Sequence, residues 1–293
     1  MFAQRRTIVA PSPPRPLDKV ARRVQEISSL PTVAIRVMEV TRDSNASTEE
    51  LKAVLESDAS LSARMLRLVN SSTYGLRERV SNLQTAIAYL GFRQIRNLAL
   101  TSSISEVFKK DERIGTYSRP ALWRHLVSVG VCSRMLAMRR GLENFEDVFL
   151  AGLLHDVGII LEDQYDHASF RSMVSSLGGD VCLEEAERGE LGYTHMELGG
   201  VVAEQWRFPE LVTGAIRHHH HAVVPADEHQ QAIRCIQVAN TVCTLKNISS
   251  VGLNLLKPPV DATVGLHLLK PDIEALVVDL DEELQRQSML FTL

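Results

Sequence analysis

The 293-residue chain lacks several features that would place a protein in a class at once. It has no basic excess, because 32 Lys and Arg stand against 36 Asp and Glu, and binding to phosphate backbones needs clustered cations. Its four cysteines form no C-x-x-C pair and are too widely spaced to suggest a disulfide framework. It has no apolar run of about 20 residues and no signal-peptide core. We therefore expect a cytoplasmic protein with reduced thiols, without membrane or nucleic-acid partners.

The sequence also lacks the period-two alternation of strands, and its apolar residues recur instead at helical spacing. Ser47 followed by Glu50 predicts a capped helix start, Asp58 begins another helix, and Gly91 interrupts the apolar pattern of residues 83–107. A long helix is expected from about residue 117 to 140, with Gly141 as its stop. The pattern predicts an all-α, multi-helix bundle of about a dozen helices, with later ones at 145–160, 165–177, 180–189, 195–206, 209–221, 228–245, 261–267 and 271–288.

Composition divides the chain into four parts. Residues 1–16 are rich in proline and are expected to form a flexible tail. The charged run from Lys109 to Arg113 marks a weak boundary, so we expect a helical lobe at about 17–115 and a second lobe at about 116–245. Residues 246–293 would form a C-terminal helical extension, serving as a cap or as the contact of a possible homodimer.

The residues with most chemical meaning are histidines and one His-Asp pair. His155 and Asp156 lie in an apolar stretch, where an unpaired buried charge is costly, so the pair needs a partner. Adjacent residues reach one metal ion only if the helix is irregular there or their side chains converge. Imidazole and carboxylate suit Fe, Mn, Zn or Ni, and two such ions would make a site that cleaves phosphoesters. Each histidine alone is as readily an ordinary core or surface residue; the other candidates are His125, His195, the run His218 to His221, and Asn240.

Longer motifs resemble those of the HDOD domain, the HD-related output domain of bacterial signalling proteins. The N-terminal motifs are Asp58 to Gly75 (DASLSARMLRLVNSSTYG), Leu83 to Gly91 and Ile95 to Ala99, and the later ones surround His155, His195 and His219. The resemblance covers residues 25–245 and implies an HD-like helical bundle. It also implies an HD-type ligand pattern at His125, His155, Asp156, His195 and one or both of His219 and His220, with Asn240 in place of a final aspartate.

Three departures bear on activity. Asn240 offers a weaker neutral oxygen, Ile159 stands where the related HD-GYP hydrolases carry a lysine, and the G-Y-P motif is missing after His221. The first hypothesis is therefore a non-catalytic signalling module that binds a partner protein or small signal molecule and retains a pocket for one or two divalent ions. The alternative is a metal-dependent phosphohydrolase, in which Glu190 and Arg217 could support the ligands or contact phosphate.

Two polar groups have alternative interpretations. Asn70 is expected to be buried and to join the two lobes by hydrogen bonds. Arg64, Arg67, Arg93 and Arg96 could form a basic face for nucleic acid, although solvated helix surfaces are the better interpretation at a net charge of −4.

Overall fold

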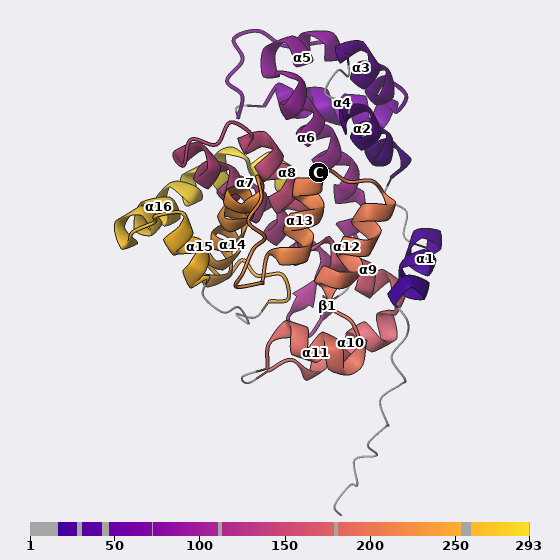
Figure 1. The fold of residues 1–293 in the computed structure, drawn as a ribbon. Coiled ribbons are helices and arrows are strands. Elements are labelled where there is room, and N and C mark those ends of the chain that lie inside the picture. The colour runs from indigo at the N-terminus through magenta and orange to yellow at the C-terminus, as the bar shows by residue number, and fades with distance from the viewer. Residues whose placement is uncertain are drawn as a thin grey trace, which may run out of the picture.

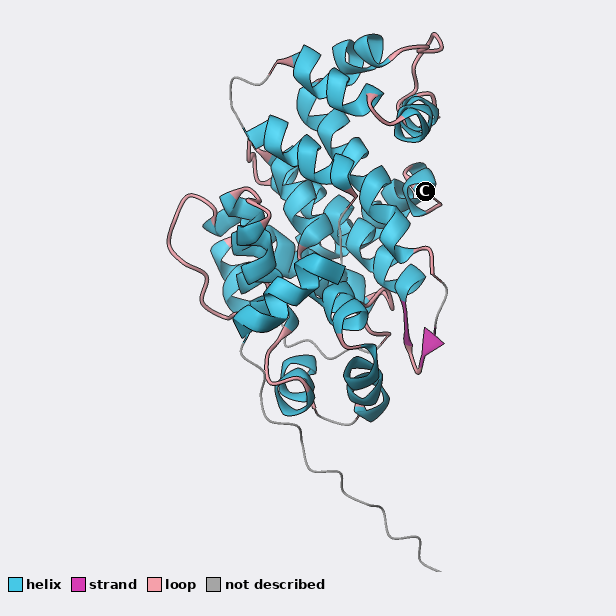
Figure 2. Cartoon of the chain, turned by 90° about the vertical axis from the view of Figure 1, so that its right-hand side faces the viewer, coloured by secondary structure: helices cyan, strands magenta, loops and turns pink. Residues whose placement is uncertain are grey.

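The structure is a computed structural model that describes residues 17–27, 31–42, 47–71, 73–110, 113–178, 181–252 and 259–292. The predicted proline-rich tail, 1–16, lies outside the described residues. The fold is all-α, as predicted (Figures 1 and 2). The α-helices are α1 (Leu17–Ile27), α2 (Thr32–Arg42), α3 (Thr48–Glu56), α4 (Ala59–Val69), α5 (Leu83–Leu90), α6 (Phe92–Ile104), α7 (Arg119–Arg139), α8 (Phe145–Leu154), α9 (Val157–Tyr165), α10 (His167–Ser176), α11 (Leu183–Glu190), α12 (His195–Gln205), α13 (Glu210–His218), α14 (Gln230–Leu245), α15 (Val260–Gly265) and α16 (Lys270–Arg286). Two 3₁₀ turns, η1 (Ser105–Phe108) and η2 (Ser288–Phe291), complete the helical elements of the described residues.

The local signals at the helix ends are confirmed. The Ser47 hydroxyl accepts the backbone N–H of Glu50, whose carboxylate accepts the N–H of Ser47 in return, which satisfies two free donors at the start of α3. The Asp58 carboxylate caps α4 by accepting the backbone N–H of Leu61, without a bond in return. Gly91 adopts a φ of 83° between α5 and α6, a conformation that glycine takes without a steric cost.

Two predicted elements are wrong in detail. The helix expected at 145–160 is two helices, α8 and α9, separated by His155 and Asp156. The sequence predicts no strand, yet β1 (Arg113–Ile114) and β2 (Tyr117–Ser118) pair antiparallel, with Ile114 opposite Tyr117. A two-residue turn with Gly115 at a φ of 57° joins them, and such tight turns favour a hairpin over a continuing helix.

The helices form two packed regions that share one hydrophobic core (Figure 1). Helices α2 to α6 lie together at one end, and α7 runs through the other region against α8, α14 and α16. α1 lies apart from α2 and packs on α9 and α12 through Val20, Ala21 and Val24. In the C-terminal segment, η2 meets α7 through a hydrogen bond from Trp123 Nε1 to the carbonyl oxygen of Leu290. No described helix has both the length and the apolar character that crossing a membrane requires.

The contact between the regions depends on a different asparagine from the one predicted. Asn70 is half-buried and bonds to the backbone of Val80 within the α2–α6 region, so the expectation that it joins the two lobes is wrong. Asn97 on α6 is buried and donates to both the backbone oxygen and the carboxylate of Glu146 at the start of α8. The buried Arg96 beside it pairs with Asp147 at 2.8 Å.

These pairs also remove most of the basic face considered from the sequence. Arg93 pairs with the same Asp147, and Arg64 pairs with Glu106. Of the four arginines, Arg67 is the one for which the described residues show no ion pair.

Candidate metal centre

The break between α8 and α9 places the His-Asp pair. Residues on both sides of the pair are buried, from Val148 to Leu154 and from Val157 to Asp163, so the chain passes straight through the core here. Asp156 leaves the helical path, with φ −100° and ψ 19°, and this local irregularity lets its side chain and that of His155 converge. Two adjacent residues can reach one metal ion only where the helix is irregular or their side chains converge, and both hold at His155 and Asp156.

A glycine brings the opposing helix close. A Cβ atom on Gly158 in α9 would lie 1.9 Å from the backbone oxygen of His195, the first residue of α12. Only glycine allows this approach of α12 to α9, and the approach carries the His195 ring to Asp156.

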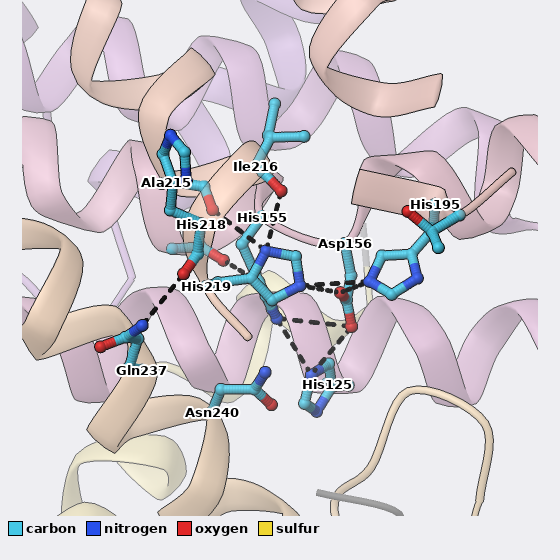
Figure 3. A network of polar contacts seen from close by, with 12 residues as sticks. His125, His155, Asp156, His195, Ala215, Ile216, His218, His219, Gln237 and Asn240 are labelled. Carbon is cyan, nitrogen blue, oxygen red and sulfur yellow. Dashed lines mark hydrogen bonds and ion pairs between the residues drawn. The ribbon is translucent and has the colours of Figure 1, made fainter. Parts of the chain in front are cut away.

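Four imidazoles surround the Asp156 carboxylate (Figure 3). Its Oδ1 lies 2.9 Å from Nε2 of His219 and 3.4 Å from Nε2 of His195. Its Oδ2 lies 3.4 Å from Nε2 of His155 and 3.5 Å from Nε2 of His125. The five residues come from α7, the α8–α9 junction, α12 and the end of α13, and all are buried.

The other ring nitrogen of each imidazole is held from behind. Nδ1 of His125 donates to the carbonyl of Ile248, Nδ1 of His155 to that of Gly152, and Nδ1 of His219 to the carbonyls at the end of α13. A carbonyl oxygen can only accept, so in these three rings Nδ1 carries the proton and the Nε2 lone pair points inward. The geometry thus turns several lone pairs toward one carboxylate.

The imidazoles of the cluster differ in their pKa. Burial lowers the pKa of His155 to about 4, so the ring is neutral at pH 7. Burial alone would raise the pKa of Asp156, but the surrounding imidazoles, His155 first, lower it well below its usual range when they carry a second proton. Asp156 Oδ1 is buried without a hydrogen bond from any described residue, although His219 Nε2 is 2.9 Å away, because the His219 proton is on its other nitrogen.

The donor set fits a divalent metal ion. The ligand atoms form two groups, and within each group all atoms lie within 4.8 Å of one another. One group consists of Asp156, His195, His219 and His220, and the other of His125, His155 and Asp156. Asp156 belongs to both groups, one oxygen facing each side. Inward lone pairs beside an unpaired carboxylate oxygen are what a cation stabilises, and neutral imidazole with carboxylate suits Fe, Mn, Zn or Ni.

Sequence reasoning missed a buried acidic pair behind His195. The Glu187 carboxylate accepts the His195 Nδ1 proton at 2.7 Å and also its backbone N–H. Burial lowers the pKa of His195, but the Glu187 carboxylate outweighs this and raises it to about 9. Glu162 on α9 is fully buried beside Glu187, and burial together with that neighbour raises its pKa well above the usual range. The sequence does contain a signal for the burial of Glu187. This residue lies four positions from both Leu183 and Leu191, so it shares the buried side of α11 with them.

The remaining predicted residues lie in different places. Asn240 is buried on α14 with its amide toward the cluster, and it accepts a hydrogen bond from Thr244 (Figure 3). Glu190 is exposed at the end of α11, one turn beyond Glu187, and Arg217 pairs with Glu204 at 2.7 Å. The structure therefore brings Asn240 to the cluster and gives neither Glu190 nor Arg217 a described contact with it.

A cavity of about 260 Å³ opens beside the cluster. His219, His220 and Asn240 form its inner wall, and Glu184 and Asp261 stand among its other lining residues. Among the described residues that line it, none is Lys or Arg. The cavity can admit a small molecule, but its described lining offers no Lys or Arg to a phosphate group.

Comparison with known proteins agrees with this fold. The sequence profile of the HDOD domain matches residues 27–222. An HDOD domain protein of unknown function from Geobacter sulfurreducens has a TM-score of 0.73 at 25% identity, over 94% of this chain and 98% of that one. A protein from Marinobacter aquaeolei, provisionally named a signal transduction protein, has a TM-score of 0.74 at 23% identity, over 94% of this chain and 63% of that one.

Two further relatives complete the comparison. A protein from Shewanella amazonensis, provisionally named a phosphohydrolase, has a TM-score of 0.68 at 22% identity over 93% of this chain and 96% of that one. An uncharacterised curated protein from Treponema pallidum is 23% identical over 223 residues. This chain spans 43% of that relative's length. The solved structures at 22% and 23% identity establish the HD-like fold alone.

Proposed function

The chain belongs to the HDOD family, and we propose that it is a regulatory signalling module that binds a divalent metal ion and acts, without catalysis, by binding a partner protein or a small signal molecule. The observation that carries the metal-binding part is the set of inward lone pairs of His125, His155 and His219 around the buried Asp156. His125, His155, His195 and His219 would hold the ion with Asp156, and His220 and Asn240 would stand at its open side.

The case against catalysis rests on the cavity. A phosphodiester would approach the ion past Glu184 and Asp261, and the described lining of the cavity contains no Lys or Arg. Enzymes that cleave phosphoesters stabilise the negative charge of the transition state with cations as well as metals. Here the side chains would repel an anionic substrate, so binding without turnover fits the lining better.

The way the ligands are distributed supports a regulatory role. They come from four separate segments, and His125 is tied through its second nitrogen to Ile248, at the entry to the C-terminal segment. Ligand contacts from several helices fix those helices relative to one another. Occupancy of the centre would therefore set the arrangement of the surfaces that a partner meets.

The alternative function is a metal-dependent phosphohydrolase, favoured by one observation. Asp156 faces ligand groups on both sides, and a carboxylate shared between two ions is compatible with a two-metal site. A divalent ion would supply Lewis acidity and lower the pKa of a bound water when present.

One experiment separates the two. The purified protein is analysed for metal content and then assayed, loaded in turn with Fe, Mn, Zn and Ni, against bis(p-nitrophenyl) phosphate and cyclic di-GMP. We expect bound metal and no turnover above that of Asp156→Asn. Turnover that this variant abolishes would establish the phosphohydrolase, and protein without metal after reconstitution would reject both functions.

A further inference from the structure

A second hollow lies away from the metal centre, on the α2–α6 region. It has a volume of about 850 Å³ and runs between α4 and the segment that connects α4 to α5, with Met289 of η2 at one edge. Its lining contains Arg67, Arg77 and Arg79 but one carboxylate, that of Glu78. None of its lining residues belongs to the metal centre, so it needs a separate explanation.

The three arginines are available to a ligand. All three are exposed, and the described residues provide no ion pair to any of them. Two other arginines of the α2–α6 region are paired, Arg64 with Glu106 and Arg93 with Asp147. In a chain with a net charge of −4, three unpaired guanidinium groups around one groove form a local positive surface.

The groove is also partly apolar and is held in shape. Leu66 and Leu76 are half-exposed in its lining, and Met289 is 37% exposed. The Asn70 side chain accepts the N–H of Val80 at 2.8 Å and donates to its carbonyl at 2.8 Å, which fixes the connecting segment against α4. A pre-shaped groove loses less entropy on binding than a flexible loop.

From these features we infer that the groove binds an acidic segment of a partner protein, in which Asp or Glu residues alternate with apolar ones. The carboxylates would pair with Arg67, Arg77 and Arg79, and the apolar side chains would lie on Leu66, Leu76 and Met289. Arginine suits this task because its planar group binds a carboxylate through two hydrogen bonds.

A nucleic acid fits the same surface less well. A phosphate backbone carries charge along its whole length and needs an extended basic track. The lining of this groove holds three arginines with Glu78 among them, which is a local cluster of cations and not an extended track.

The test measures binding by fluorescence anisotropy with a labelled peptide of about ten residues in which Asp and Glu alternate with Leu. The full chain is compared with a triple variant, Arg67→Glu, Arg77→Glu and Arg79→Glu. The matched control reverses three exposed arginines outside the groove, Arg36→Glu, Arg113→Glu and Arg171→Glu. Thermal unfolding of both variants checks that the fold is retained.

We expect the groove variant to bind the peptide roughly 10- to 100-fold more weakly, from the loss of three charge pairs, and the control to bind within about threefold of the wild type. A peptide with Lys in place of Asp and Glu should not bind. A chelator should not change the binding of the peptide. Failure of the groove to bind the peptide would therefore leave the metal-binding proposal untouched. Equal binding by all three proteins, no binding by the wild type, or preference for a single-stranded oligonucleotide over the acidic peptide would overturn the inference.

Discussion

Replacing Asp156 with asparagine should remove the response of the protein to metal. Asp156 is the one residue shared by both ligand groups, and all four imidazoles reach it within 3.5 Å. Asparagine keeps the size of the side chain but replaces an anionic oxygen with a neutral amide, which is a much weaker ligand. The change therefore tests the chemistry of the centre with little effect on its packing.

The magnitude follows from ligand linkage. An ion present at about 100 times its dissociation constant stabilises the folded state by about 2.7 kcal/mol. In a protein of this size about 1 kcal/mol shifts the midpoint of thermal unfolding by 2–4 °C, so chelation of the wild type should lower the midpoint by roughly 5–10 °C. The metal-free variant can equal or exceed the metal-free wild type, because asparagine removes a buried charge.

The diagnostic quantity is therefore the change in the midpoint on adding a chelator, measured by differential scanning fluorimetry or calorimetry after reconstitution with one metal. Asp261→Asn is the matched control, because Asp261 is exposed and lines the same cavity. We expect a shift in the wild type and in the control, and none in Asp156→Asn. A wild type that does not respond to the chelator, or an Asp156→Asn variant that responds fully, would refute the assignment of the centre.

Three further substitutions test its surroundings. Glu187→Gln should weaken metal binding about 10- to 100-fold in a chelator competition, because the carboxylate supports a ligating histidine, whereas the exposed Glu190→Gln on the same helix should leave it unchanged. The pKa of Glu162 is raised in the folded state, so the stability it contributes is complete below about pH 4.5 and is lost as pH rises through the folded-state pKa. The free energy of unfolding of Glu162→Gln, measured in urea, should therefore increase relative to that of the wild type by up to about 1.4 kcal/mol per pH unit as pH rises. A difference between the two proteins that stays constant with pH would contradict this. Gly158→Ala should cost about 1–3 kcal/mol or more, because its Cβ would lie 1.9 Å from a backbone oxygen of α12, while Gly189→Ala, which meets nothing within 4 Å, should be neutral or stabilising.

The helical fold was largely predictable because its signals are local. Capping pairs such as Ser47 with Glu50, and breaks such as Gly91, act within a few residues and do not depend on distant contacts. The break at His155 and Asp156 was missed for the opposite reason. The apolar pattern continues across it from Leu150 to Leu161, so periodicity predicts one helix. The interruption is visible only in the three-dimensional packing.

The candidate site was predictable as a set of residue types but not as a network. Family resemblance selected His125, His195 and His219, and the structure brings all three to Asp156. It could not decide which glutamate supports His195, because Glu187 and Glu190 are three residues apart on one helix. Burial decides this, and the burial of α11 depends on helices that lie far from it in sequence.

Asn240 bears on how many ions the centre can hold. The buried carboxylates that face the ligands are those of Asp156 and, behind His195, Glu187, whereas burial and the neighbouring Glu187 raise the pKa of Glu162 and so favour its neutral form. Two negative charges balance one divalent ion, whereas a second ion would leave an excess of two positive charges in a buried site, which is costly. An aspartate at position 240 would have reduced that excess, but the amide of Asn240 does not. The charge balance therefore favours one ion for each chain, and a metal content near two in the elemental analysis would contradict it.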